Sequence, residues 1–503
     1  MIGTTVPKLW FARLRQDWTR LDTNRHPAAH STRREALDLA VLALLGLGLV
    51  ISAFLTPHLH SIAARAPLFT LLEAIQFGFF IAAAIWVIRR RPATRYALPL
   101  IVLIALAARL VMVTGGPAAS SDLYRYVWDA RVQTHGINPY RYAPQDQALV
   151  GLRDAAIYPS INRKPVHTIY PPVAQFSFLA IYVIHPDSID WLRSALSLVD
   201  TGVIGLIALA LARLGERPER VILYAWHPLA IFEIGSSGHI DVVAVALLLV
   251  ALHGRLSRRP IVTGIGLAAA TLVKYYAVAA APALLTGNWR RDLKFTGGFL
   301  ATSVLAYIPY LSVGWGVVGF LPGYVKEEGI ASGGRFYLLE QVEHLGNWLG
   351  WHLPSALINH GISDVHLFDL LLVATMGGMA VWIWRRSERF PRDVPRRALA
   401  LYLTLLVLST PTYPWYALLA LVLLPFAGKR LLLATLFASG TSLLLYLQWW
   451  WRGSPQWPLA VVYGGSALIL TAVSIWFGLS AIRWKRLFTA IPKRVALSSS
   501  QEA

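Results

Sequence analysis

The chain has 503 residues, of which 56% are hydrophobic and only 14% are charged, and its mean hydropathy is +0.52. Soluble domains carry about a quarter charged residues, so this composition excludes an ordinary soluble enzyme and indicates a polytopic membrane protein. The net charge of +20 does not indicate nucleic-acid binding, because the basic residues form short clusters between apolar runs. Such clusters are typical of cytoplasmic loops that face anionic lipid.

The two ends of the chain are basic. Residues 1–35 mix arginines with apolar and aromatic side chains and lack the apolar core of a signal peptide. We expect them to form a cytoplasmic basic amphipathic arm. We also expect a cytoplasmic basic tail at 483–503, which leaves residues 36–482 as one transmembrane domain.

Apolar runs long enough to span about 30 Å of hydrocarbon recur along this domain. They predict an all-α polytopic membrane protein with about 14 (roughly 12–14) transmembrane helices. The expected spans are 36–56, 67–88, 97–114, 190–213, 219–235, 239–254, two half-helices within 260–291, 295–314, 366–384, 397–411, 414–428, 430–451 and 457–482. The run at 173–185 is too short to span, so we expect an interfacial or re-entrant helix on the outer side.

The basic clusters orient these spans. With the arm and RRRPATR (89–95) inside, residues 115–171 and 315–365 become two large outer loops. Segment 260–291 is basic at both ends and therefore cannot be a single crossing helix. Two half-helices that meet near residues 271–274 satisfy the charge rule and place Lys274 deep in the membrane or at its outer boundary.

The first outer loop opens with SDLYRYVWDARVQTHGINPY, which carries two carboxylates and two guanidiniums, those of Asp122, Arg125, Asp129 and Arg131. On a helix Asp122 and Asp129 share one face, with Arg125 beside them. One interpretation is a salt-bridged helix start capped by a preceding serine. The other is a functional carboxylate at the mouth of a membrane helix.

Three further polar groups fall on the same side. WHPLAIFEIGSSGHIDVV (226–243) brackets a glycine-rich break with Glu233, His239 and Asp241. The spacing of His239 and Asp241 suits a metal poorly, so we expect no metal and instead a turn that exposes both to an outer cavity. Lys274 lies too far from either basic flank to reach the interface easily, so it needs an anionic partner.

The third group is LSTPTYPWYALL (408–419), where prolines break the helices beside Tyr413, Trp415 and Tyr416. These aromatic residues suit either the interfacial belt of a membrane protein or the wall of a sugar site.

An outer carboxylate, an intramembrane cation and aromatic rings together suit sugar transfer from a lipid phosphate. Lys274 would hold the phosphodiester, and a carboxylate would deprotonate the acceptor hydroxyl. Because phosphate is a good leaving group, neither a second acid nor a cofactor is required. The sequence contains no P-loop or dinucleotide fingerprint.

These stretches resemble the GT-C superfamily of multi-spanning glycosyltransferases, and within it the polyprenol-phosphate-mannose-dependent mannosyltransferases of the GPI first-mannose and bacterial lipoglycan types. The matching stretches are SDLYRYVWDARVQTHGINPY, IYPPVAQF (169–176), WHPLAIFEIGSSGHID, GLAAATLVK and PTYPWYALLALVLLP. His227 and Ile240 depart from the family pattern, which usually has Asn before Pro and before Asp. The resemblance implies a GT-C fold with extracytoplasmic juxtamembrane helices.

The resemblance also implies metal-independent, inverting transfer of a hexose, most directly mannose, at the outer face of a bacterial inner membrane. Asp122 would be the catalytic base, and the expected donor-phosphate ligands are Lys274, Arg125 and Arg131. The expected substrate-binding residues are Asp129, Tyr170, Glu233, His239, Asp241, Tyr413 and Trp415, although Asp129 also suits an arginine partner. The expected partners are a polyprenyl-phosphate sugar, a lipid or glycan acceptor, and membrane lipids.

Two other functions stay open from the residues alone. A transporter or flippase for a lipid-linked or anionic solute would also explain buried charges, but it needs comparable gates on both faces. A lipid-linked glycan ligase or polymerase would differ in using a preassembled chain as the donor.

Overall fold

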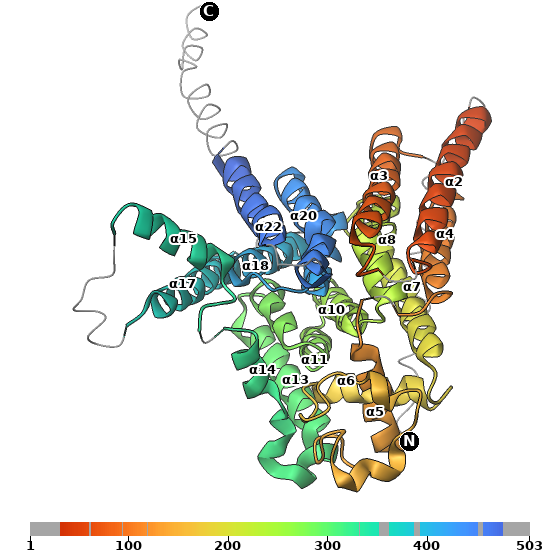
Figure 1. The fold of residues 1–503 in the computed structure, drawn as a ribbon. Helices are drawn as coiled ribbons and strands as arrows, with labels where there is room; N and C mark the ends of the chain where they lie inside the picture. The colour runs from red at the N-terminus through yellow and green to blue at the C-terminus, as the bar shows by residue number, and fades with distance from the viewer. Residues whose placement is uncertain are drawn as a thin grey trace, which may run out of the picture.

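The computed structural model describes residues 31–59, 62–92, 94–117, 119–330, 332–351, 362–386, 393–450 and 456–475. Within these ranges the chain forms helices and turns and no strand (Figure 1). Most of the expected arm at 1–35 and all of the expected tail at 483–503 lie outside the described residues.

Long helices alternate with short helical turns along the described chain. In chain order the helices are α2 (Ser31–Leu55), α3 (Ala66–Arg90), α4 (Ala97–Val113), α5 (Asp122–Thr134), η1 (Gln147–Leu152), η2 (Tyr158–Ser160), α6 (Pro172–Tyr182), α7 (Ile189–Arg213), η3 (Pro218–Val221), α8 (Ile222–Ala225), α9 (Pro228–Ala230), η4 (Ile231–Ser236), α10 (Asp241–Leu256), α11 (Pro260–Thr271), η5 (Tyr275–Ala280), α12 (Ala281–Leu284), α13 (Trp289–Tyr307), η6 (Ile308–Val318), α14 (Leu321–Glu327), α15 (Tyr337–Trp348), α17 (Asp364–Arg385), α18 (Val394–Ser409), η8 (Pro414–Ala417), α19 (Leu418–Leu421), η9 (Leu424–Phe426), α20 (Lys429–Thr441), η10 (Ser442–Tyr446), α21 (Leu447–Trp450), α22 (Trp457–Leu459) and η11 (Ala460–Gly464).

Seven helical runs of the described chain are long and apolar enough to cross a membrane. They are Arg33–Leu55, Ala66–Arg90, Ile189–Arg213, Trp289–Glu327, Asp364–Arg385, Leu431–Trp450 and Trp457–Ile475. Shorter apolar helices, such as α4 and α11, lie between them. The all-α polytopic fold is confirmed, whereas the count of about 14 crossings stays a prediction.

Several expected spans are broken rather than continuous. As expected, segment 260–291 divides into short helices, with the break after Thr271. Unexpectedly, 219–235 divides at His227 and Pro228 and continues as the π-helical turn η4. The expected span 414–428 is likewise divided into η8, α19 and η9. Pro414 begins η8, and Pro425 lies in η9, where its missing N–H is unfavourable for a continuous α-helix.

The expected second outer loop is also more helical than its sequence predicted. The helical run that begins at Trp289 continues beyond residue 314 through η6 into α14. Gly314, with φ 55°, bends the run without ending it.

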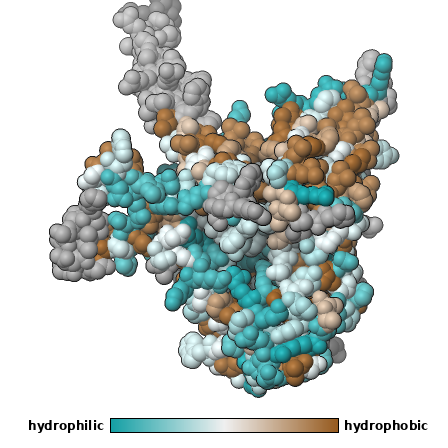
Figure 2. All heavy atoms as spheres, viewed as in Figure 1, coloured by the Kyte–Doolittle hydropathy of each residue, from teal (hydrophilic) through white to brown (hydrophobic). Residues whose placement is uncertain are grey.

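One end of the bundle gathers the loops with basic clusters, and we call it the arginine end. Arg217 donates to the Pro92 carbonyl at 2.9 Å, and Arg220 donates to the Pro425 carbonyl at 3.0 Å. These contacts join three loops that the charge pattern places inside. Figure 2 shows hydrophobic surface over the helices near this end and mostly hydrophilic surface in the lower part of the view, where α5 and α6 lie.

The opposite end is held together by a fully buried arginine. Arg193 of α7 donates to the Gly115 carbonyl at 2.7 Å and to the Gly235 carbonyl at 3.1 Å. It therefore joins the start of the first outer loop to η4. The first outer loop also contacts the helical run that leads into the second, because Asn138 donates to the carbonyl of Tyr310 in η6 at 2.9 Å.

The first outer loop is a folded layer rather than an open strand of chain. Its helix α5 is anchored by Arg131, which forms ion pairs with Asp154 and Asp187, both at 2.6 Å. Burial raises the pKa of Asp154, but Arg131 and the N–H groups of Tyr158 and Ile157 outweigh burial and lower this pKa from 3.8 to about 2. The guanidinium of Arg131 therefore joins α5 to Asp154 in the loop and to Asp187 after α6.

Arg131→Gln should lower the thermal unfolding midpoint of the protein, because two carboxylates lose their counter-charge. The pair with Asp154 stabilises the fold above the unfolded pKa of 3.8 and loses this contribution as the pH falls towards 2. As the pH falls, the unfolding midpoint of the variant should therefore decrease less than that of the wild type. Melting followed by tryptophan fluorescence between about pH 6 and about pH 2.5 measures both effects. The control Arg141→Gln removes an exposed charge from the same loop; if both variants melted like the wild type, the anchoring role would be wrong.

Candidate functional site

A cavity of about 670 Å³ lies where the outer layer meets the helix breaks. Stretches far apart in sequence line it, namely parts of 119–125, 162–171, 273–276, 321–336, 369–372 and 402–416. Of the residues predicted for the site, this cavity brings together Asp122, Arg125, Tyr170, Lys274, Tyr413 and Trp415. Asp129, Arg131, Glu233, His239 and Asp241 do not line it.

Asp122 stands at the first position of α5, directly at the cavity wall. Its Oδ1 accepts a hydrogen bond from Asn162 Nδ2 at 2.5 Å, and its own N–H donates to Ser120 Oγ at 3.2 Å. Ser121 does not cap the helix with its side chain, and no described arginine forms an ion pair with Asp122. The salt-bridged helix start therefore describes the next turns of α5 but not Asp122.

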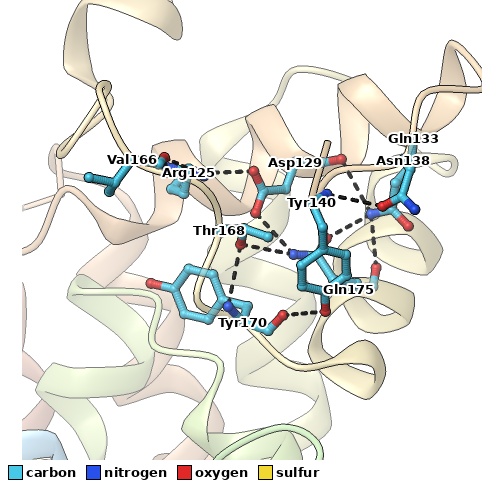
Figure 3. Close-up of polar contacts among 9 residues, drawn as sticks. All are labelled: Arg125, Asp129, Gln133, Asn138, Tyr140, Val166, Thr168, Tyr170 and Gln175. Carbon is cyan, nitrogen blue, oxygen red and sulfur yellow. Dashed lines mark hydrogen bonds and ion pairs between the residues drawn. The ribbon is translucent and has the colours of Figure 1, made fainter. Parts of the chain in front are cut away.

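Asp129 supports the cavity from behind. Figure 3 shows its carboxylate between Arg125, whose Nε donates to Oδ1 at 2.8 Å, and Gln175, whose Nε2 donates to Oδ2 at 3.0 Å. Both terminal nitrogens of Arg125 also donate to the Val166 carbonyl at 3.2 Å. Asp129 is only 2% exposed, so it positions the Arg125 guanidinium rather than reaching the cavity itself.

The same network positions Tyr170. Gln175 donates to Thr168 Oγ1 at 3.1 Å, and the Tyr140 hydroxyl donates to the Tyr170 carbonyl at 2.6 Å (Figure 3). The ring of Tyr170 packs edge-on against Tyr126, with ring centroids 5.0 Å apart. Tyr126, which is fully buried, thus supports the ring of Tyr170 at the cavity wall.

Lys274 lies at the break between α11 and η5, in extended backbone with φ −141° and ψ 113°. Its Nζ lies 2.9 Å from Asp241 Oδ2, and Asp241 Oδ1 accepts the Tyr276 hydroxyl at 2.6 Å. The anionic partner expected for Lys274 is therefore Asp241. The lysine still lines the cavity, whereas Asp241 is fully buried behind it.

The expectation that His239 and Asp241 are exposed to the outer cavity is wrong, because both are fully buried. The turn after η4, with Gly238 at φ 66°, directs them into the protein. The His239 ring stacks on Trp415 at 4.0 Å, and its Nε2 lies 3.3 Å from Glu233 Oε2. Glu233 is fully buried as well, so these residues support Trp415 rather than contact a ligand.

The aromatic residues of the 408–419 turn belong to the cavity and not to a lipid-facing belt. Tyr413 and Trp415 stack with ring centroids 4.4 Å apart, and both line the cavity. Trp415 is only 8% exposed.

Sequence reasoning missed several residues of the cavity wall. Arg335 donates to the Ser409 carbonyl at 3.1 Å and pairs with Glu328 at 2.7 Å, and Arg163 pairs with Glu327 at 2.8 Å. Charged residues in the expected outer loops could have indicated these positions. Their spacing in the sequence, however, does not show that they line one cavity. Among the described residues, no group of three or more His, Asp or Glu side chains could hold a metal ion.

Two family models match the chain. The first, described as "Alpha-(1->6)-mannopyranosyltransferase, N-terminal domain", matches residues 39–289, and the second, described as "Glycosyltransferase family 87", matches residues 168–411. No curated protein matches the chain. The two matched ranges contain Asp122, Tyr170 and Lys274. Both families are of the GT-C mannosyltransferase type, and the chain therefore belongs to the GT-C glycosyltransferases, enzymes embedded in a membrane.

Proposed function

We propose that this glycosyltransferase moves a mannosyl group from polyprenyl-phosphate mannose to a hydroxyl of a lipid or glycan acceptor. The observation that carries the proposal is that Asp122 and Lys274, from separate elements, line one cavity. A carboxylate that accepts a proton and a cation that holds a phosphate are the two groups this reaction needs. The name of the first matched family supports mannose as the sugar and an α-(1→6) linkage in the product.

Asp122 is the proposed general base. Asn162 occupies Oδ1 and fixes the orientation of the carboxylate, which leaves Oδ2 to accept the proton of the attacking hydroxyl. The oxygen of the acceptor hydroxyl bonds to the anomeric carbon as the bond from that carbon to the phosphate oxygen breaks. Because the attack is a single displacement, the anomeric centre inverts.

Lys274 is the proposed ligand of the donor phosphate. An ammonium has three N–H donors, and the pair with Asp241 uses one of them. The other two can hold the phosphate and stabilise the charge that develops as it leaves. Arg125, held by Asp129 and the Val166 carbonyl, adds a second positive charge at the same wall. With a phosphate leaving group, the proposed reaction needs no metal and no cofactor.

Tyr170, Tyr413 and Trp415 would cover the faces of the sugars. Arg131 is not part of this proposal, because its contacts are those of the outer layer. Glu233, His239 and Asp241 enter it only as supports of Trp415 and Lys274.

The cavity is proposed to face outward. It lies at the end of the bundle opposite to the arginine end, which the charge pattern assigns to the cytoplasm. A recess at the arginine end, lined by Arg255 and Arg259, measures only about 20 Å³. This asymmetry favours an enzyme over a transporter, which needs access from both sides.

Asp122→Asn keeps the shape of the side chain and removes its basicity. Turnover with polyprenyl-phosphate mannose should fall by about 10²- to 10⁴-fold with little change in donor binding. The matched control Asp129→Asn, on the same helix, should lose thermal stability and retain more activity, because it breaks the pair with Arg125. Near-normal turnover in Asp122→Asn would assign the base to another residue.

Removing Lys274 alone would leave the buried Asp241 without a counter-charge and lower stability. The double variant Lys274→Met with Asp241→Asn removes both charges together. It should melt close to the wild type but bind donor phosphate at least about tenfold more weakly, as expected for a lost charge-assisted contact. Titration with polyprenyl phosphate measures this affinity. If the double variant bound polyprenyl phosphate as tightly as the wild type, Lys274 would have only a structural role.

The chain has no cysteine, so single cysteines report the orientation directly. Ser121→Cys, at the cavity wall, should react with a membrane-impermeant maleimide added outside intact cells. Ser257→Cys, in the exposed loop after α10, should react only after the membrane is permeabilised. The reverse pattern would invert the proposed topology.

A further inference from the structure

Helix α17 brings to the cavity a carboxylate that the proposed mechanism does not use. Asp369 lies in the second turn of α17 and lines the cavity together with Leu372. Its sequence neighbours Leu370 and Leu371 are 64% and 56% exposed, as expected for a helix that faces lipid. Asp369 is therefore the polar exception on an apolar part of α17.

A small apolar cluster sets the direction in which this part of α17 faces. Phe368 packs on Phe336 with ring centroids 5.0 Å apart, and Val365 and Leu372 pack against the same cluster. Phe336 and Leu372 themselves line the cavity. Asp369 is thus held at the cavity by the packing of its neighbours and not by a charged partner.

The cations around the cavity do not neutralise Asp369. Each lysine and arginine in the lining pairs with another carboxylate, in the pairs Arg125–Asp129, Lys274–Asp241, Arg163–Glu327 and Arg335–Glu328. No described residue donates to the Asp369 carboxylate. A half-buried carboxylate beside hydrocarbon is costly unless a ligand or water satisfies it. Asp122 and Asp369 are therefore the carboxylates of the lining that no lysine or arginine of the described chain pairs with.

The unpaired charge indicates which substrate group it meets. A phosphate would be repelled by a second anion, so Asp369 does not suit the phosphate of the donor. Sugar hydroxyls are hydrogen-bond donors, and an ionised carboxylate accepts several at once through its two oxygens.

We propose that Asp369 binds hydroxyl groups of the acceptor, a sugar or polyol head group, and directs the reactive hydroxyl towards Asp122. The inference rests on the proposed function and adds the acceptor side of the site. Asp369 is a substrate-binding residue in this arrangement, while proton transfer stays with Asp122.

Octyl α-mannoside is a suitable acceptor probe, because its octyl chain partitions into detergent or lipid while its head group carries only hydroxyls. Asp369→Asn should weaken its binding to the full-length protein, measured by calorimetry, on the order of tenfold, as expected for one lost charge-assisted hydrogen bond. The acceptor KM should rise by a similar factor with an unchanged donor KM. Asp369→Glu, which keeps the charge, should retain most of the affinity.

Asp364→Asn is the matched control. It removes the same charge from the first turn of the same helix, outside the cavity lining, and should change neither affinity. Melting curves of both variants separate binding from folding.

The proposal is overturned if the wild type does not bind octyl mannoside, or if Asp369→Asn binds it as the wild type does. It is also overturned if Asp369→Asn lowers the melting temperature and weakens donor and acceptor binding in parallel. Because calorimetry needs no turnover, a wild type that binds octyl mannoside through Asp369 but transfers no mannose would contradict only the proposed function.

Discussion

The ion pair between Lys274 and Asp241 joins two places where helices break inside an apolar bundle. Asp241 begins α10 and is fully buried, while Lys274 stands in extended backbone after α11. Either charge alone at this depth would cost several kcal/mol, so the two breaks must lie side by side. The Tyr276 hydroxyl, which donates to the same carboxylate, holds the start of η5 to them. This constraint sets the inner wall of the cavity.

Broken helices expose backbone groups, and the structure satisfies them from neighbouring elements. The Leu272 carbonyl at the break after α11 accepts the N–H groups of Val173 and Ala174, which begin α6. At the end of α18, Thr410 Oγ1 donates to the Arg335 carbonyl at 2.7 Å and accepts the Tyr337 N–H at 3.0 Å. Irregular backbone at membrane depth is tolerated only where protein or water satisfies it. The short helix α6 thus has a structural reason to lie beside the cavity.

The cavity divides its chemistry between two parts of the molecule. The proposed base, Asp122, belongs to the outer layer, whereas the proposed phosphate ligand, Lys274, belongs to the bundle. A substrate that joins a lipid to a sugar would lie across this boundary, with its phosphate at the bundle and its sugar under the outer layer. The position of the outer layer relative to the bundle, held by Arg193 and by the contact of Asn138 with Tyr310, therefore decides whether the two groups can act together.

The sequence by itself determined the fold class, the principal apolar helices and the break near Lys274, because bilayer thickness and the cost of buried charge act on each segment separately. It also indicated the Arg125–Asp129 pair, whose members are one helical turn apart. Only the tertiary structure decided that His239 is buried behind Trp415, that Arg131 anchors the outer layer, and that Asp369 reaches the cavity. Periodicity and hydropathy report contacts within a few residues and with the surrounding lipid. The partner of a side chain in a distant segment depends instead on how the broken helices and the outer layer pack, which no local pattern contains.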